Sequence, residues 1–317
     1  MYATGKTCKP DLRLRGIGRF FNLNNERFCL YSMMVIPIGF FLVFKYIPMF
    51  GFVIAFQDYN IFEGIFGSPF VGFENFVEIF RMNDFMQAFK NTFVLSILSI
   101  LFGFPGPILL ALMLNEVRSS AYKRTVQSIV YLPHFLSWVI IGGMVYRIFS
   151  EKYGIINNVL DFIGVGRVPF LSDGKWWTFT YLVAVIWQGI GYGSIVYLSA
   201  ITSINDELYE AAKVDGCGRL RAIWNITLPS IRPTIITMLL LQIGNVLNIG
   251  FEKAYALGNS MVTQYSDILS TFVYRIGVQN ARFSIATSVG LFQSIVGFVL
   301  LTGANYAAKK IGEDGLW

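Results

Sequence analysis

A short polar segment, residues 203–232, interrupts an otherwise apolar sequence and has the most regular residue spacing in the chain. It contains Glu-Ala-Ala, a glycine after three further residues, and Ile-x-Leu-Pro after nine more. The alanines leave little side chain between this backbone and a partner, while the charged residues could orient it. The chemistry predicted for the segment is therefore protein docking, and a solvated helical hairpin is the alternative. The residues of the pattern are Glu210, Ala211, Ala212, Asp215, Gly216, Arg219, Ile226, Leu228 and Pro229.

The local sequence predicts two short helices joined at a glycine corner. Asn205 can cap a helix whose first turn holds acidic residues, which oppose the helix dipole. Gly216 and Gly218 can end that helix. A second helix is expected over 219–228, with apolar residues at i, i+3 and i+4, and Pro229 is expected near its limit.

Composition predicts that the elements positioning this segment are membrane helices. The 317 residues are 55% hydrophobic and 14% charged, against about 25% charged in a typical soluble domain. Spanning segments need roughly 20 apolar residues, and lipid requires each spanning backbone to satisfy its own hydrogen bonds. We therefore expect an all-α membrane protein with a six-helix transmembrane bundle. The predicted spans are 28–50, 92–114, 128–149, 177–201, 233–251 and 283–306.

The distribution of basic residues predicts the orientation of the bundle. Fifteen Lys and Arg residues lie on the side of the two termini and of the polar segment, against eight in the opposite loops. This bias favours cytoplasmic N and C termini. The predicted organisation is a basic cytoplasmic tail (1–27), a transmembrane domain (28–306) with an external loop (57–90) and the cytoplasmic polar loop (203–232), and a cytoplasmic tail (307–317).

The polar loop resembles the EAA-x3-G-x9-I-x-LP loop by which bacterial ABC importer permeases dock onto an ATPase. Four other stretches extend the resemblance over most of the chain. Residues 69–76 resemble an external element of carbohydrate-importer permeases. Residues 44–48, 131–138 and 248–253 resemble the branch that handles complex or polysaccharide-derived oligosaccharides.

The resemblance implies a permease subunit in the bacterial cytoplasmic membrane, which it crosses several times. Its implied partners are a second homologous permease subunit, two ABC ATPase subunits, an external solute-binding protein, membrane lipid and an oligosaccharide substrate, with no nucleic acid. It further implies that ATP and Mg²⁺ are bound by the partner ATPases and that this chain has no cofactor of its own.

The chain lacks the residues expected of an enzyme or an ATPase. No Gly-x4-Gly-Lys-Ser/Thr sequence occurs, and Cys8, Cys29 and Cys217 have no metal-ligand spacing. The single histidine, His134, has no nucleophile elbow beside it. We expect His134 to pack in the bundle with a hydrogen-bond partner or to line a polar route. The functional alternative to an ABC permease is a secondary transporter or channel for a polar solute.

Polar residues inside the predicted spans are candidates for a substrate path, because polar side chains are costly facing lipid. Amides suit hydroxyl recognition, since each has donors and an acceptor. The fifth span places Gln242, Asn245 and Asn248 on one helix face, with Glu252 one turn further along. The fourth span adds Trp187, Gln188 and Tyr192. Hydrogen bonding between helices is the alternative role for each.

Two charged residues near predicted spans leave the charge of the substrate open. Lys45 and Arg147 could neutralise an acidic, polysaccharide-derived oligosaccharide, or could extend to the membrane interface. The basic tail leaves a similar choice between contact with anionic lipid and a solvated segment.

Overall fold

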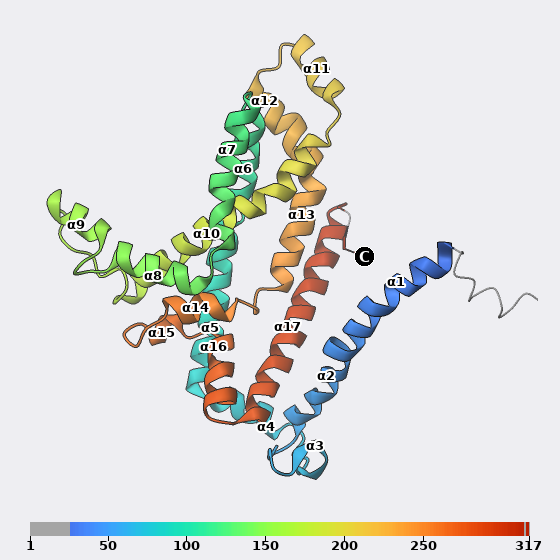
Figure 1. Ribbon diagram of the computed structural model, residues 1–317, viewed down its shortest axis with the longest axis vertical. Coiled ribbons are helices and arrows are strands. Elements are labelled where there is room, and N and C mark those ends of the chain that lie inside the picture. Colours follow the sequence, from blue (N-terminus) through green and yellow to red (C-terminus); the bar gives the residue numbers. More distant parts are fainter. Residues whose placement is uncertain (1–25, 314, 317) are drawn as a thin grey trace, which may run out of the picture. The chain divides into compact units, whose positions relative to one another are not determined.

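Helices long and apolar enough to cross a membrane dominate the structure, a computed structural model that describes residues 26–313, 315 and 316 (Figure 1). Five helical stretches pass this test, or six if one sharply bent pair is counted as a span. The chain divides into two compact units, 1–53 and 54–317. The tail predicted over 1–27 lies almost wholly outside the described residues. The limits predicted for the other domains remain predictions.

The helices follow one another along the chain with short connections. The first unit contains α1 (Glu26–Phe41), the π-helical segment η1 (Leu42–Tyr46), α2 (Ile47–Met49) and the start of the 3₁₀ segment η2 (Phe50–Phe56). The second unit continues with α3 (Gly64–Gly67), α4 (Glu74–Arg81), α5 (Asn83–Leu98), η3 (Ser99–Gly103), α6 (Pro105–Glu116), α7 (Ser120–Tyr131), η4 (Leu132–Phe135), α8 (Trp138–Phe149) and α9 (Ile155–Phe162). It ends with α10 (Gly174–Thr202), α11 (Asp206–Val214), α12 (Arg219–Ala222), η5 (Ile223–Thr227), α13 (Leu228–Gly244), α14 (Phe251–Leu257), α15 (Thr263–Ser266), α16 (Leu269–Val273), η6 (Tyr274–Gln279) and α17 (Phe283–Lys310).

Three of the predicted spans correspond to long helices that extend beyond the predicted limits. The second span is part of a 34-residue helical stretch, Asn83–Glu116, in which the π-helical turn η3 joins α5 to α6. The fourth and sixth spans are α10, with 29 residues, and α17, with 28. The Asp173 side chain accepts hydrogen bonds from the Lys175 and Trp176 backbone N–H groups, which fixes the start of α10.

The third span, predicted as one helix over 128–149, is instead broken. The stretch Ser120–Phe135 and α8 are bent by 103° relative to each other. Pro133 lacks a backbone N–H, and Leu136 has an extended conformation. The Ser137 hydroxyl then accepts a hydrogen bond from the Ile140 N–H at 3.4 Å and so caps a new helix.

The fifth span, predicted over 233–251, is shifted toward the polar loop. One helical stretch runs from Arg219 to Gly244, so Pro229 does not end the second helix of the loop as expected. The π-helical turn η5 precedes Pro229, and such turns absorb breaks in the regular hydrogen-bond ladder. At the other end, the Asn245 amide donates to the Leu241 carbonyl at 2.9 Å, which competes with continuation of the helix.

Close helix packing holds the second unit together around three apolar clusters. One cluster joins α5, α8, α10 and α14, a second joins α4, α5, α16 and α17, and a third joins α6, α10 and α13. On α10, a Cβ at Gly191 would lie 1.9 Å from the Val130 carbonyl oxygen, so only glycine lets α10 approach α7 this closely. A Cβ added at Gly189, by contrast, would have no other atom within 4 Å. Gly191 is therefore the residue of α10 that the close contact with α7 requires.

Candidate functional site

The polar loop folds into the predicted hairpin, at the end of the second unit where α11 lies (Figure 1). The Asn205 side chain accepts a hydrogen bond from the Glu207 N–H at 3.1 Å and caps α11. At the other end, the Cys217 N–H donates to the Ala212 carbonyl and the Gly216 N–H to the Lys213 carbonyl. This pair of bonds is a Schellman motif, which needs a left-handed residue at its turn. Gly216 has that conformation, with φ of +73°.

The spacing of the sequence pattern is explained by this geometry. Ala212 accepts the outer bond of the Schellman motif, and Gly216 must follow it by four residues. The confirmed features are therefore the Asn205 cap, the first helix and the glycine corner. Gly218 has an ordinary negative φ and begins the next helix as its N-cap.

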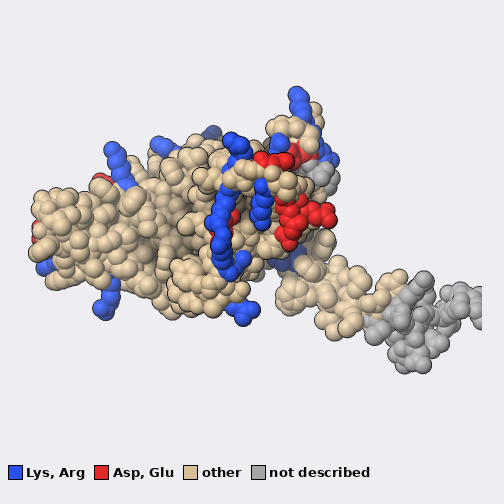
Figure 2. Space-filling model, turned by 90° about the horizontal axis from the view of Figure 1, so that it is seen from above, with Lys and Arg blue, Asp and Glu red and all other residues tan. Residues whose placement is uncertain are grey.

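The hairpin presents both charged and apolar side chains to solvent. Glu210, Ala211, Asp215 and Arg219 are exposed. So are several large apolar side chains of the same loop: Leu208, Val214, Leu220 and Trp224. Exposed apolar groups rimmed by charge are typical of protein interfaces. Figure 2 shows acidic and basic side chains crowded together over this end of the molecule.

Two contacts tie the hairpin to itself and to the neighbouring helix. The Tyr209 and Thr227 hydroxyls lie 2.9 Å apart and share a hydrogen bond. Arg219 lies 4.0 Å from Glu116 at the end of α6, and both side chains are largely exposed. The surface ion pair contributes little to stability. The position of α11 therefore depends mainly on its two connections and on the Tyr209 bond.

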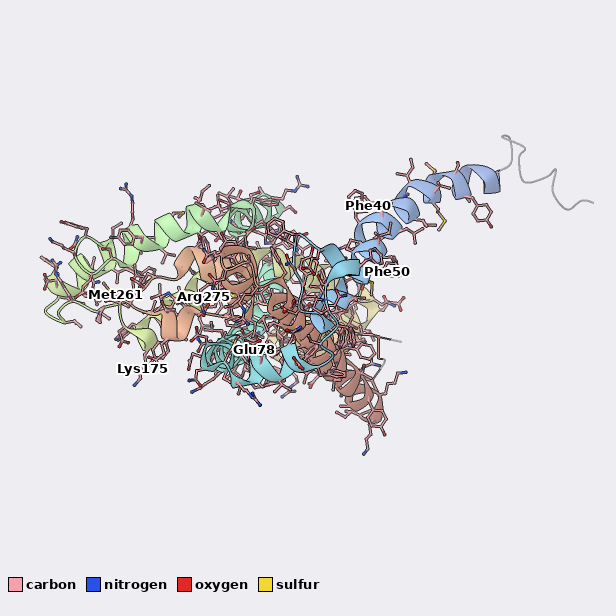
Figure 3. The ribbon with its side chains drawn as sticks, turned by 90° about the horizontal axis from the view of Figure 1, so that it is seen from below. Phe40, Phe50, Glu78, Lys175, Met261 and Arg275 are labelled. Carbon is pink, nitrogen blue, oxygen red and sulfur yellow. The ribbon has the colours of Figure 1, made fainter. Side chains whose placement is uncertain are left out.

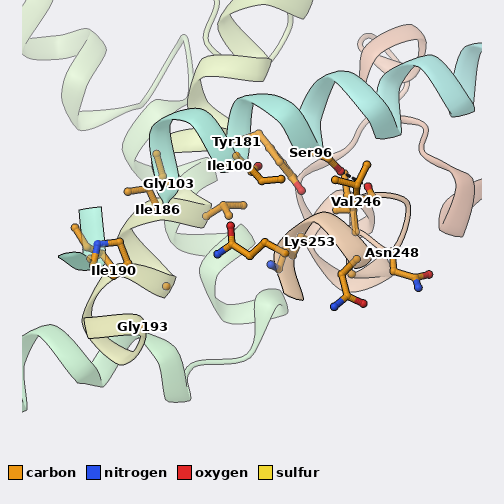
Figure 4. A pocket seen from close by; sticks show the side chains of 18 residues that line it. Ser96, Ile100, Gly103, Tyr181, Ile186, Ile190, Gly193, Val246, Asn248 and Lys253 are labelled. Carbon is orange, nitrogen blue, oxygen red and sulfur yellow. Dashed lines mark hydrogen bonds between the residues drawn. The ribbon is translucent and has the colours of Figure 1, made fainter. Parts of the chain in front are cut away.

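A second candidate site is a polar cavity of about 310 Å³ between α5, α10 and the chain that links α13 to α14 (Figure 4). Its polar lining includes hydroxyls, amides and one ammonium group. The Ser96 hydroxyl donates a hydrogen bond to the Val246 carbonyl, which ties α5 to the turn after α13. The lining residues are Ser96, Ser99, Ile100, Gly103, Pro107, Tyr181, Val185, Ile186, Gly189, Ile190, Gly193, Gln242, Asn245, Val246, Asn248, Ile249, Gly250 and Lys253.

Three of the four fifth-span residues predicted for a substrate path line this cavity, but for a different reason from the one expected. Gln242 lies in the last turn of α13, Asn245 caps its end, and Asn248 lies in the turn that follows. The single helix face proposed for them is therefore wrong. Glu252 is exposed in the first turn of α14 and is not one of the lining residues. The turn, rather than helical periodicity, brings the three amides together.

Lys253 was not selected from the sequence, although it lines the same cavity. Its ammonium lies 5.7 Å from the centre of the Trp138 ring, which is buried at the start of α8. Burial lowers the pKa of Lys253, because desolvation disfavours the charged form. The ion pairs found among the described residues do not include Lys253. The spacing of the chain gives no sign that this residue is buried.

The residues predicted on the fourth span lie in a different environment. Tyr192 stacks on the His134 ring with centroids 3.9 Å apart and planes 2° apart, and Gln188 donates to the His134 carbonyl at 3.3 Å. These residues connect α10 to the bend between α7 and α8. Trp187, Gln188 and Tyr192 are not part of the cavity lining. The His134 Nδ1 atom is buried and has no partner, so the hydrogen bond expected for its ring is not found at this atom.

The two charged residues considered for an acidic substrate, Lys45 and Arg147, are both exposed and lie outside the cavity lining. At the end opposite α11, other basic residues are paired. Arg275 lies 2.7 Å from Asp267 and 3.5 Å from Asp84, and Arg282 lies 2.5 Å from Glu78 (Figure 3).

The external stretch 69–76 is anchored by a buried amide, because Asn75 donates to the Ala55 and Gln57 carbonyls at 2.9 Å each. At the start of α10, Trp176 is exposed. Trp177 is a core residue that donates to the Leu257 carbonyl at 2.8 Å.

Apolar helices long enough to cross a membrane, an exposed polar hairpin and a cavity between helices are features that suit a membrane transport protein. The match to the family model "binding-protein-dependent transport system inner membrane component" covers residues 103–311. The chain belongs to this family. It is therefore an importer permease subunit in the bacterial cytoplasmic membrane, which it crosses several times, and not itself an enzyme.

Relatives and solved structures match nearly the whole chain. The polygalacturonan/rhamnogalacturonan transport system permease protein YteP of Bacillus subtilis is 45% identical over 91% of this chain and 90% of its own length. Protein LplB of the same organism is 42% identical over 96% of this chain and 95% of its own. A chain in the crystal structure of a bacterial alginate ABC transporter, in complex with an alginate pentasaccharide-bound periplasmic protein, is 45% identical. Its TM-score is 0.83, and the match covers 91% of this chain and 96% of that chain.

Proposed function

We propose that this chain is one of two related permease subunits of an ATP-driven importer for polysaccharide-derived oligosaccharides. In this proposal, an external solute-binding protein delivers the sugar, and two ATPase subunits that bind ATP and Mg²⁺ dock on the loop 203–232. The loop and both termini then face the cytoplasm. The names of two of these proteins support a sugar substrate, because one describes a polygalacturonan/rhamnogalacturonan transport system and the other an alginate transporter.

The polar cavity is the observation that carries the sugar part of this proposal. Its volume of about 310 Å³ lies at the lower end of the range for small-molecule sites, roughly 300–1,000 Å³. Amides from Gln242, Asn245 and Asn248 line it. They offer donors and acceptors to sugar hydroxyls. The remaining predicted path residues, Glu252, Trp187, Gln188 and Tyr192, are proposed to act elsewhere or not to contact the sugar.

The hairpin carries the coupling part of the proposal. ATP-driven closure of the two ATPases would move α11, which is joined to α10 and α12 by short connections. That movement would tilt the helices around the cavity, so that the cavity opens to the other side of the membrane. Such a change requires contacts that differ between the two states. The proposed coupling residues are Glu210, Ala211, Ala212, Asp215, Gly216, Arg219, Ile226, Leu228 and Pro229.

The test is purification of the whole complex through a tag on this chain, followed by sugar-stimulated ATPase activity in lipid nanodiscs. We compare the wild type with Glu210→Ala, and use Lys213→Ala in the same helix as the matched exposed control. We expect the ATPase subunits to co-purify with the wild type and the control, and activity to rise when a sugar-loaded binding protein is added. Glu210→Ala should lower the stimulated activity while the permease remains folded.

Two results would contradict the proposal. Absence of ATPase subunits from the wild-type preparation, with unchanged transport in the Glu210 variant, would favour a secondary transporter or channel. If the ATPase subunits co-purify but no oligosaccharide-loaded binding protein stimulates their activity, the docking role would stand. The proposal that the substrate is an oligosaccharide would then be wrong.

A further inference from the structure

Lys253 lies in an environment that leaves its charge without a protein counter-ion in the described part of the chain. It lines the cavity from the first turns of α14, and its ammonium has the Trp138 ring as its recorded partner (Figure 4). The ring supplies a partial negative face but no full charge. A partly buried ammonium without a carboxylate is costly, since desolvation is not offset by an ion pair.

The rest of the polar lining is suited to a sugar but not to a cation. Amides of Gln242, Asn245 and Asn248 are neutral, and the Ser96 hydroxyl is already bonded to the Val246 carbonyl. None of the residues lining the cavity is Asp or Glu. An anionic group that enters together with hydroxyls would therefore complete the surroundings of Lys253.

We propose that Lys253 is a specificity-determining residue that binds a carboxylate of an acidic oligosaccharide, so that the importer selects sugars built from uronic acid units. This inference rests on the proposed import of oligosaccharides and adds the charge of the substrate. The Trp138 ring holds the ammonium at the cavity wall, and the amides bind the hydroxyls of the same sugar. A neutral sugar of the same size would leave the ammonium unpaired.

Other basic residues do not offer the same arrangement. Lys45 and Arg147 are exposed and do not line the cavity. Arg275 is already paired with Asp267 and Asp84. Among the residues that line the cavity with Gln242, Asn245 and Asn248, Lys253 is the basic one.

The experiment uses the full complex with its binding protein, reconstituted in nanodiscs. The variants are Lys253→Met, which removes the charge and keeps the length, Lys253→Arg, which restores a cation, and Lys175→Met, an exposed lysine outside the cavity lining (Figure 3). ATPase stimulation is measured against the concentration of binding protein loaded with a galacturonate or alginate pentasaccharide. Direct binding of the same sugars and of their carboxyl-reduced forms is measured by saturation-transfer NMR on the complex without binding protein.

A hydrogen bond to a charged group contributes enough to change affinity by about ten- to a hundredfold. We expect Lys253→Met to weaken binding of the acidic sugar by this factor and to leave the carboxyl-reduced sugar nearly unchanged. Lys253→Arg should recover most of the loss, and Lys175→Met should behave as the wild type. Basal ATPase activity should not change in Lys175→Met.

Three outcomes separate the possible explanations. Equal losses for acidic and reduced sugars would overturn the proposal and indicate that Lys253 is structural or pairs with a carboxylate of the second permease subunit. Unchanged acidic-sugar binding in Lys253→Met would also overturn it while the import of sugars stood. A wild-type complex that responds to no oligosaccharide would instead reject the proposed function.

Discussion

The polar hairpin and the cavity differ in how the chain builds them. The hairpin is formed by neighbours in sequence: the Asn205 cap, the Ala212 carbonyl and the Gly216 turn lie within twelve residues. The cavity draws its lining from Ser96 to Lys253, on three separate parts of the second unit. A local pattern can therefore specify the first site almost completely, whereas the second exists only after the helices have packed.

This difference also separates the kinds of change to which each site is sensitive. In the hairpin, backbone conformation is decisive, because the corner depends on a left-handed residue. In the cavity, side-chain chemistry is decisive, because its amides come from a turn whose path is fixed by packing of α13 on α17. A Cβ at Gly244 would lie 3.2 Å from the Leu301 side chain, which shows how close that packing is.

The largest effect is expected from Gly216→Val in the hairpin. A β-branched residue in the left-handed region costs at least about 1–2 kcal/mol, so the corner should open or α11 should fray. We expect the concentration of ATPase subunits needed for half-maximal assembly to rise at least about five- to thirtyfold. The measurement is titration of the purified permease with its ATPases, monitored by fluorescence.

Gly218→Ala is the matched control for this change. Gly218 has an ordinary φ of −73°, and a Cβ there meets open space. The control should assemble like the wild type. Equal weakening by both variants would show that the loop tolerates no added side chain at all, and the argument from the Schellman corner would be wrong.

The hairpin could be predicted from the sequence better than the cavity, because its signals are local and those of the cavity depend on helix packing. The cap and the glycine corner are short-range signals, and both are confirmed. The broken third span had comparable signals, Pro133 followed by a serine cap at Ser137, but the continuous apolar composition concealed them. The end of α13 depends on the Asn245 amide competing for the Leu241 carbonyl. The predicted span continued beyond this end because it was based on apolar composition alone.

Lys253 shows what local patterns omit. Its burial requires Trp138, which is more than a hundred residues earlier in the chain and starts the helix after the break. Because the break was not predicted, the neighbourhood of Trp138 could not be predicted either. A charge in a connecting segment is normally solvated, so no sequence pattern predicted that this one lies in a cavity.

An intermediate effect is expected from Asn248→Leu in the cavity. The substitution keeps a similar side-chain volume and removes the amide that is proposed to bind a sugar hydroxyl. Loss of one such hydrogen bond is worth about 0.5–1.5 kcal/mol. The concentration of sugar needed for half-maximal ATPase stimulation should therefore rise about two- to tenfold.

Glu252→Gln distinguishes the cavity from the helix face predicted from sequence. Glu252 is exposed and does not line the cavity. Sugar stimulation should be unchanged in this variant. If Glu252→Gln weakened stimulation as much as Asn248→Leu, the path would follow the original helical spacing, and the cavity would not be the relevant site.

The smallest measurable loss of transport is expected from Asn205→Ala, which weakens the hairpin without changing its corner. Removing an N-cap costs typically about 1 kcal/mol, so amide hydrogen exchange in the first turn of α11 should quicken about fivefold. The Tyr209–Thr227 hydrogen bond and the Schellman turn still hold the rest of the helix. ATP-driven uptake into vesicles should therefore fall only about twofold, as expected if docking selects the folded helix from a largely folded population.

Asn205→Ser keeps a capping oxygen and should restore both measurements. A loss of uptake as large as that of Gly216→Val would mean that the cap, rather than the corner, controls docking, and that the first turn of α11 is itself the contact surface.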